Sequence, residues 1–545
     1  MIDTLSKIRW RTRAARVPGM LIAGLLIFPF LLLSQTLVNY VPVHHPVYDY
    51  LERLAVESAV DWDGTVQPAS RFDVARALLQ ADAHKNRLTG VEQADLLYFE
   101  VEFRPELTAL GLTSADSSSR WHLFSYHDSR FGVDLDPVLG VTASDGDTHL
   151  FNGAKFEGTA GSDIAYGFHF NDNTEKGPSI DWQKLSVPET GINIVKSSGG
   201  NEIEYSEVRT YLSYGSNTVQ LAAGKDFVEW GSGERGKLIL SDKAPSFPII
   251  RFDYRPVSWL TFHYLHGWLQ SLVIDSSRSY ATDLPEEPRN VYREKYIAAH
   301  MLSVRPCAGL QVSLGESIIY SDGPPNILFL IPIMFFRAAD HYLTHYSQND
   351  GNNSQFFLDT RYDVLSHVRA YGTLFIDEIV PSEIFNPSQA RNQLGFTLGT
   401  RVVNPIVSNV DMSLEYTRIL PWVYSNSNPA QTYESDGYPL GDYIGQNADQ
   451  LYAAVQWRPA GRFELSLYYD YVRRGGMTDV ERQYELPSLP FLYGNIERAS
   501  LKGFAIRYEY LHDLTLVSDF HWQNPYLNGG HYNLALTLEY GLDPR

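Results

Sequence analysis

Alternation of apolar and polar side chains is the feature that most constrains this chain, and it runs from about residue 130 to the C-terminus. In RFELSLYYDYV, Phe463, Leu465 and Leu467 share one face while Glu464 and Ser466 share the other. The segment HYNLALTLEY repeats the pattern near the end of the chain. A period of two places successive side chains on opposite faces of a β-strand. We therefore expect an all-β fold for this part of the chain.

The alternating segments group into nine pairs, which predicts eighteen antiparallel strands. The pairs are 131–144 with 148–159, 162–170 with 205–215, 218–226 with 249–255, 258–270 with 293–304, 308–320 with 354–364, 367–377 with 392–402, 408–420 with 447–457, 462–474 with 498–510, and 513–523 with 531–541. Connections between pairs are short, as in RPVS and RPAG, whereas those within pairs are mostly long. Such asymmetry and an even strand number are typical of outer-membrane barrels, whose closure leaves no backbone group unpaired in lipid. We predict a transmembrane β-barrel over 129–545.

The N-terminus carries the pattern of an export signal. KIRWRTRAAR is basic, and GMLIAGLLIFPFLLLS is apolar but short for a membrane-spanning helix. We expect a signal peptide over 1–38 and a location in the Gram-negative outer membrane. A retained signal anchor stays open, because SQTLVNYVPV offers no A-x-A cleavage motif. The chain ends on Arg545, whereas such barrels usually end on an aromatic residue.

Residues 39–128 show helical rather than strand periodicity. Val47, Tyr50, Leu51 and Leu54 fall on one helical face. Further helices are predicted to begin at two caps, Ser70 with Asp73 and Thr89 with Glu92. The second of these places Leu96, Phe99 and Phe103 on one stripe. We expect a periplasmic bundle of about three helices.

Charge and residue types argue against several functional classes. The chain has 44 Lys and Arg against 64 Asp and Glu, a net charge of −20, which disfavours nucleic acid as a partner. Its single cysteine, Cys307, cannot form an internal disulfide and is expected to be a small buried residue. Asp377 and Glu378 are neighbours on a strand and face opposite ways, so they cannot form a glycosidase pair. We predict no catalytic residues, no metal and no cofactor.

The stretch WGSGERGKLILSDKAPSFP matches two nucleotide-binding patterns. Its glycines fit G-x-G-x-x-G, and Gly231 to Lys237 fits G-x-x-x-x-G-K. Both patterns require a helix to follow, yet Pro245 and Pro248 prevent one. In addition, Leu238 stands where Ser or Thr would bind magnesium. We expect no nucleotide to bind here.

Two alternatives remain for this stretch, a long loop between the fifth and sixth predicted strands. Residues 230–251 hold four basic side chains and two acidic ones in an acidic protein. A tryptophan ring beside charged groups suits a sugar face, its hydroxyls and uronate carboxylates. Alternatively, the glycines and the ring fold the loop into the lumen as a plug. The candidate polysaccharide-binding residues are Trp230, Gly231, Gly233, Arg235, Lys237, Ser241 and Asp242.

Four segments resemble the Wzi family of capsule-assembly outer-membrane proteins. GKDFVEWGSGERGKLILSDKAPSFP is similar to that family's W-G-x-G…L-x-L-S-D-x-A-P stretch. VHHPVYDYLERL, IPIMFFRAADHYLTHYSQNDGNNSQFFLDTRY and YGTLFIDEI also resemble it, whereas Lys243 replaces an expected Asn. The resemblance runs from about residue 42 to the C-terminus. It implies a surface lectin that helps attach capsular polysaccharide, in contact with outer-membrane lipid and lipopolysaccharide.

Two functional hypotheses follow. In the first, the long loops 227–248, 321–353 and 421–446 contact polysaccharide, with the apolar loop 321–353 folding inward to narrow the lumen. In the second, a polar inner face makes the barrel a porin-like channel for small solutes or saccharides. The inward residues proposed for such a channel are Arg255, His263, Glu464, Asp470, Arg507, Glu509, Asp519 and Glu539.

Overall fold

The computed structural model describes most of the chain. It covers residues 39–112, 120–128, 130–161, 163–282, 289–344, 351–380, 382, 392–524 and 529–541. The expected signal peptide, residues 1–38, and the terminal Arg545 lie outside the described residues. Within the described part, no helix combines the length and apolar character needed to cross a bilayer.

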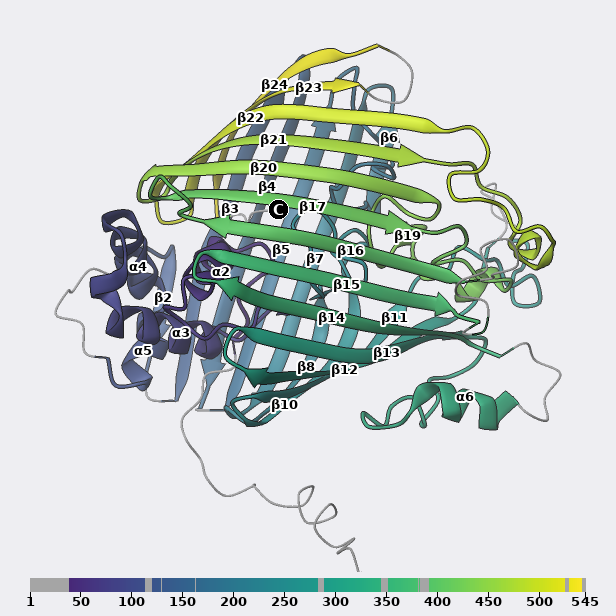
Figure 1. Cartoon of the computed structure of the whole chain (residues 1–545), viewed down its shortest axis with the longest axis horizontal. Helices are drawn as coiled ribbons and strands as arrows, with labels where there is room; N and C mark the ends of the chain where they lie inside the picture. Colours follow the sequence, from purple (N-terminus) through teal and green to yellow (C-terminus); the bar gives the residue numbers. More distant parts are fainter. Residues whose placement is uncertain are drawn as a thin grey trace, which may run out of the picture. The chain divides into compact units, whose positions relative to one another are not determined.

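Eighteen antiparallel strands close into a barrel, as the nine predicted pairs require (Figure 1). The last strand pairs with the first, with Tyr540 opposite Leu139. The strands are β3 Phe131–Ser144, β4 Asp147–Ala160, β5 Ile164–Lys176, β7 Glu202–Gly215, β8 Val219–Asp226, β10 Phe247–Val257, β11 Leu260–Leu269, β12 Lys295–Cys307, β13 Leu310–Ser321, β14 Asn353–Leu365, β15 Val368–Glu378, β16 Gln393–Val403, β17 Val410–Ile419, β20 Ala448–Ala460, β21 Phe463–Arg474, β22 Glu497–Leu511, β23 Leu514–Asn524 and β24 His531–Tyr540.

Shorter strands attach to this ring or lie apart from it. β2 (Phe124–His127) pairs with β3, and β6 (Ile194–Gly199) pairs with β7. β1 (Val66–Gln67) pairs with β9 (Glu229–Trp230), and β18 (Glu434–Ser435) with β19 (Tyr438–Pro439). β5 is longer than predicted, because its extension NDNTEK contains no apolar residue and the alternation there cannot be seen in the sequence.

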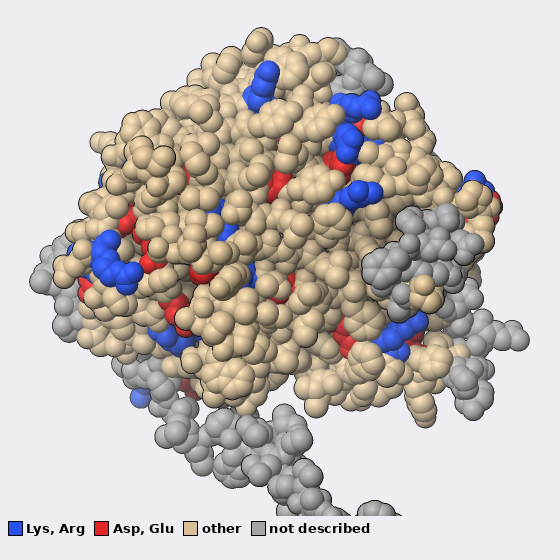
Figure 2. Space-filling view, viewed as in Figure 1, with Lys and Arg blue, Asp and Glu red and all other residues tan. Residues whose placement is uncertain are grey.

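The alternation separates an outer wall from a polar lumen. On β12 and β13, Leu302 lies opposite Leu314 and both side chains are exposed on the outside. The adjacent Ser303 and Ser313 point inward, where their hydroxyls are 2.8 Å apart. Charged side chains are sparse on the face of the barrel in Figure 2. An apolar exterior around a polar interior is what a membrane barrel requires.

The described residues of the helical segment, 39–112 and 120–128, form four α-helices rather than three. They are α2 Pro46–Val56, α3 Arg71–Ala83, α4 Gly90–Glu102 and the short α5 Arg104–Ala109. Both predicted caps form: Ser70 accepts a hydrogen bond from the amide of Asp73, and Thr89 and Glu92 form a capping box. We did not predict α5, because α4 and α5 are separated only by Phe103, which continues the same apolar stripe.

The helices lie at the short-turn rim of the barrel, the rim that faces the periplasm in outer-membrane barrels (Figure 1). The amide of Arg462, in the turn between β20 and β21, donates to Asp95 at 2.9 Å. The amide of His367, in the turn between β14 and β15, donates to the carbonyl of Val56. Bundle and barrel belong to one compact unit of the chain, so a domain boundary at 128/129 stays a prediction.

Two long loops, 227–248 and 420–447, fold into the lumen and pack against each other. The hydroxyl of Tyr424 donates to the carbonyl of Leu238 at 2.8 Å, and that of Tyr433 to Ile239 at 2.7 Å. Their side chains form a buried core with inward residues of the wall, among them Leu265, Ile297, Ile319, Phe357, Phe375, Ile419 and Val472. The first loop is thus part of a plug, as one of the two alternatives predicted.

The inward position expected for loop 321–353 is wrong, because its described part 324–344 lies on the outer wall (Figure 1). It contains α6 (Phe336–Thr344). Phe329 and Phe336 pack on Tyr296 and Ile318, whose chain neighbours point into the lumen. In a membrane barrel the apolar surface is on the outside, so an apolar loop packs its side chains against that outer surface. Cys307 also differs from expectation: it is exposed.

Candidate functional site

Trp230 sits in the core of the plug and offers no ring face to a ligand. Its side chain is 1% exposed and its ring lies near those of His263 and Phe357. Its amide donates to the carbonyl of Leu240 at 2.9 Å. The neighbouring Gly231 has φ 99°, a left-handed conformation that favours glycine. The ring and this glycine therefore shape the loop.

The polar side chains of the same loop are held by ion pairs. Arg235 donates through Nε to Asp470 of β21 at 2.7 Å. Lys237 lies 3.3 Å from Glu229. The amides of Glu234 and Arg235 both donate to the carboxylate of Glu415, at 2.7 and 3.1 Å. The loop is thus fixed to the barrel wall through its backbone as well as its charges.

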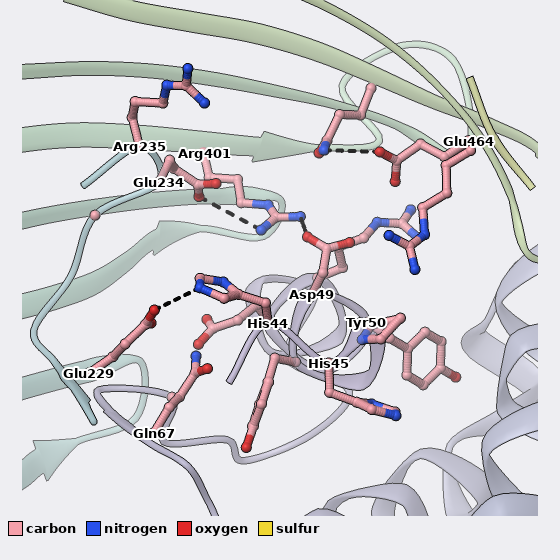
Figure 3. A pocket seen from close by; sticks show the side chains of 18 of the residues that line it. His44, His45, Asp49, Tyr50, Gln67, Glu229, Glu234, Arg235, Arg401 and Glu464 are labelled. Carbon is pink, nitrogen blue, oxygen red and sulfur yellow. Dashed lines mark hydrogen bonds and ion pairs between the residues drawn. The ribbon is translucent and has the colours of Figure 1, made fainter. Parts of the chain in front are cut away.

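A cavity of about 490 Å³ lies between this loop, the helical segment and the short-turn ends of the wall strands (Figure 3). Five of the seven candidate residues line it: Gly233, Arg235, Lys237, Ser241 and Asp242. Trp230 and Gly231 do not. The helices and the segment before them contribute His44, His45, Asp49, Tyr50, Glu52 and Arg53, and the wall contributes Arg361, Arg369, Tyr371, Arg401, Arg458, Glu464, Arg507 and Glu509.

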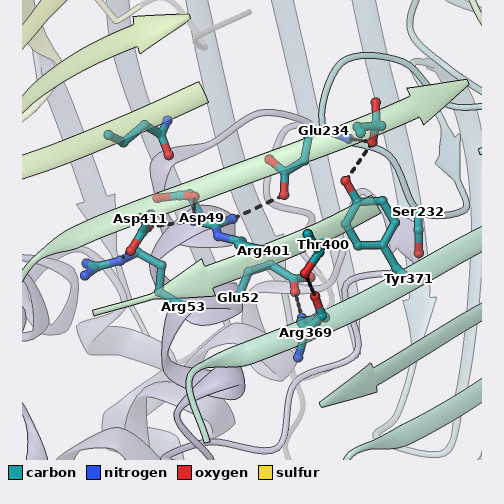
Figure 4. Close-up of polar contacts among 12 residues, drawn as sticks. Asp49, Glu52, Arg53, Ser232, Glu234, Arg369, Tyr371, Thr400, Arg401 and Asp411 are labelled. Carbon is teal, nitrogen blue, oxygen red and sulfur yellow. Dashed lines mark hydrogen bonds and ion pairs between the residues drawn. The ribbon is translucent and has the colours of Figure 1, made fainter. Parts of the chain in front are cut away.

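Buried ion pairs join the helices to the wall beside this cavity (Figure 4). Asp411 of β17 lies 2.8 Å from Arg53 of α2, 3.0 Å from Arg401 of β16 and 2.8 Å from Arg458 of β20. Glu52 of α2 pairs with Arg361 at 2.8 Å and also with Arg369. Breaking such a buried pair from one side leaves an uncompensated charge. These ion pairs therefore hold α2 against the inner wall of the barrel.

For two side chains of the cavity, Asp49 and His44, pairing with opposite charges outweighs burial. Burial opposes the charge of Asp49, yet Arg401 and Arg458 outweigh it and hold the pKa of Asp49 well below its usual range. Burial likewise opposes the charge of His44, but Glu229 and Asp242 raise the pKa of His44 to about 10. The imidazole is therefore a cation at neutral pH, held between two carboxylates.

His44, Glu229 and Asp242 are also the residue types that bind divalent cations. Their ligand atoms lie within 4.8 Å of one another. His44 Nε2 is 2.9 Å from Glu229 and 3.2 Å from Asp242. The ammonium group of Lys237, 3.3 Å from Glu229, already supplies positive charge at this point. The arrangement is accounted for by ion pairs without a metal.

Lys243, the departure from the family pattern, has a structural role. Its side chain is 1% exposed, and Nζ donates to the carbonyls of Val187 at 2.9 Å and Glu189 at 2.7 Å, and also to that of Lys184. A lysine thus ties the plug loop to the segment between β5 and β6. The shorter side chain of an asparagine would not reach as far.

Sequence reasoning missed a pair of segments at the long-loop rim, 270–282 and 289–294, which we call the rim hairpin. Bridges between Ile274 and Tyr292 and between Tyr280 and Arg289 hold it together. Tyr280 is 59% exposed and Tyr292 48%. The sequence does place both tyrosines near arginines, and tyrosine is enriched at interfaces because its ring is apolar and its hydroxyl forms hydrogen bonds.

The fold and these sites together define a plugged outer-membrane β-barrel with a helical cap. The profile of the family described as capsule assembly protein Wzi matches residues 149–536. Because this match covers more than half of the chain, the protein belongs to that family.

Solved structures agree at the level of the fold. The structure of Wzi from Escherichia coli, described as a carbohydrate-binding β-barrel involved in group 1 capsule assembly, has a TM-score of 0.59 at 14% identity, covering 92% of this chain and 99% of that one. OccAB4 of Acinetobacter baumannii has a TM-score of 0.41 at 9% identity, covering 75% and 97%. OpdK of Pseudomonas aeruginosa has a TM-score of 0.42 at 9% identity, covering 75% of this chain and 98% of that one. No curated protein matches the sequence.

Proposed function

We propose that this protein is an outer-membrane lectin that binds exported polysaccharide and helps to hold the capsule at the cell surface. Membership of a capsule-assembly family supports the proposal, and so does the described carbohydrate binding of E. coli Wzi, which shares the fold. The family is one of capsule assembly, which supports a non-enzymatic role.

The observation that carries the proposal is the lining of the cavity. Its volume of about 490 Å³ falls in the range of small-ligand sites. Arg235, Lys237, Ser241 and Asp242 give it donors and acceptors for sugar hydroxyls and uronate carboxylates. The stacking contact expected from Trp230 is not part of this proposal, since that ring is buried.

A second contact surface is favoured by the exposed rings at the long-loop rim. Tyr280 and Tyr292 lie on the side of the barrel that faces the exterior in outer-membrane proteins. Tyrosine rings cover pyranose faces while their hydroxyls remain available for hydrogen bonds. This surface can meet a long polymer outside the cell, whereas the cavity at the opposite rim can hold only a short saccharide unit.

Binding of short polysaccharide fragments to the purified full chain tests both sites. A charged hydrogen bond contributes about 1.5 to 3 kcal/mol, so Arg235→Gln should weaken fragment binding about tenfold or more. Tyr280→Ala with Tyr292→Ala should instead reduce retention of long polymer on cells, where many weak contacts act together. Tyr342→Ala is the matched control, because this tyrosine is 79% exposed on the outer-wall segment.

Unchanged binding of fragment and polymer by both sets of variants, with normal barrel assembly, would exclude both surfaces. A loss confined to the rim variants would place recognition outside the cavity. The cavity residues would then be purely structural.

A further inference from the structure

A row of arginines crosses the outer wall of the barrel just below its long-loop rim. Arg418 of β17 is opposite Asp449 of β20, Asp449 is opposite Arg473 of β21, and Arg473 is opposite Arg498 of β22. Each of the four lies within two residues of the strand end at that rim. The register therefore brings three guanidinium groups and one carboxylate together on four adjacent strands.

These side chains point away from the lumen. Ile419, Ala448 and Val472, their immediate neighbours in the chain, belong to the buried core inside the barrel. Since successive residues of a strand face opposite sides, the arginine row faces outward. In Figure 2, basic side chains gather over the ends of β17 to β22 on a face where charged groups are otherwise sparse.

The positive charge of the row is only partly compensated by described residues. Asp449 accepts from Nε of Arg473 at 2.8 Å and from the hydroxyl of Tyr416 at 3.0 Å. Arg418 stacks over the ring of Phe491 at 3.7 Å, and its buried Nε makes no hydrogen bond within the described structure. Arg498 is exposed and has no ion pair or hydrogen bond to another described residue. The row thus presents guanidinium donors that a second anion can use.

Aromatic side chains lie directly beneath the row. Two residues further from the rim, the register runs from Tyr416 through Leu451 and Tyr471 to Ser500. Two residues below that, it runs from Tyr469 through Lys502 and Trp522 to Tyr532. Lys502 lies over the ring of Trp522 at 4.6 Å. Aromatic girdles mark the membrane interface of such barrels. The arginine row is therefore at the level of the lipid headgroups of the outer leaflet.

An apolar hollow of about 610 Å³ continues below this girdle. It is lined by Leu414, Val455, Leu467, Phe504 and Phe520, and the small side chain of Ala453 contributes to its floor. Because the hollow is open to the bilayer and almost wholly apolar, an acyl chain is the ligand that fits it.

We propose that this surface, the arginine row with the hollow below it, binds a phosphorylated glycolipid of the outer leaflet. Guanidinium groups bind phosphate through paired hydrogen bonds, and the hollow takes one of the attached acyl chains. Three like charges close together on a membrane wall are unfavourable without such an anion. The proposal does not depend on polysaccharide binding by the cavity or the rim hairpin.

The test measures binding of defined lipids to the full chain in lipid nanodiscs. The probe is a diphosphorylated, acylated diglucosamine lipid, compared with its dephosphorylated form and with inorganic phosphate. We expect Arg498→Gln to lower affinity for the phosphorylated lipid about tenfold, whereas Arg337→Gln, an exposed arginine elsewhere on the outer wall, leaves it unchanged. Ala453→Phe, which fills the hollow, should also weaken binding without removing a charge.

Three results would overturn the proposal. The first is equal affinity of the Arg498→Gln variant and the parent for the phosphorylated lipid. The second is equal binding of the phosphorylated and dephosphorylated lipids by the parent. The third is full displacement of the lipid by millimolar inorganic phosphate, which would indicate a simple anion site. Heat-modifiability on gels confirms in each case that the variant barrel has assembled.

Discussion

At the residue scale, Asp411 shows how much depends on a single carboxylate. It lies within ion-pair distance of three arginines from one helix and two strands, and its side chain is 1% exposed. Asp411→Ala would remove the one carboxylate that the three arginines share, leaving Arg53 with Glu92, and Arg401 and Arg458 with Asp49. We expect a loss of about 3 to 5 kcal/mol, the range for breaking a buried pair from one side. Thermal unfolding in detergent measures this loss of unfolding free energy. A loss below about 1 kcal/mol would contradict a stabilising role for these ion pairs.

His44 gives a pH dependence whose sign can be stated. Its pKa is raised to about 10 by the two carboxylates that outweigh its burial. The stabilisation is therefore complete below the unfolded value of about 6.5 and is lost as pH rises through the folded value. The difference in unfolding midpoint between the parent and His44→Gln should shrink from pH 6.5 to pH 10. A difference that stays constant or grows over this range would show that the imidazolium is not the stabilising species.

At the element scale, the strands could be predicted because their signals are local. Alternation identified β21 and β24, and the short turns fixed the pairing of their neighbours. The sequence left the burial of Trp230 as one of two alternatives and did not predict the outward position of α6, since each depends on partners distant in the sequence. The cavity is a similar case. Its loop residues were identified from the sequence, but its arginines come from separate strands and are brought together only when the barrel closes.

The outer-wall segment covers polar groups that would otherwise face lipid. Glu316 of β13 accepts from the amide of Phe336 at 2.6 Å, at the first turn of α6, and lies 3.3 Å from His300. Replacing both Phe329 and Phe336 by alanine should detach this segment, because each buried phenylalanine contributes a few kcal/mol. We expect faster protease cleavage within residues 324–344, with the barrel itself intact on gels. Unchanged cleavage would show that other contacts hold the segment.

At the scale of the whole molecule, the plug bears on the channel hypothesis. The core formed by loops 227–248 and 420–447 reaches inward residues of strands from β10 to β21. We expect purified protein in planar bilayers to show no steady open steps, and a variant lacking residues 231–244 to show them. Large, steady conductance from the parent protein would support the porin-like alternative instead.

The pairing of β24 with β3 has a consequence for the order of assembly. The first and last strands of the ring meet, so the wall cannot be sealed until the end of the chain has been delivered. Both plug loops belong to strands in the middle of the sequence and already lie inside that wall. Every other junction of the ring joins strands that follow one another in the chain, so this seam alone depends on residues from both ends of the barrel sequence.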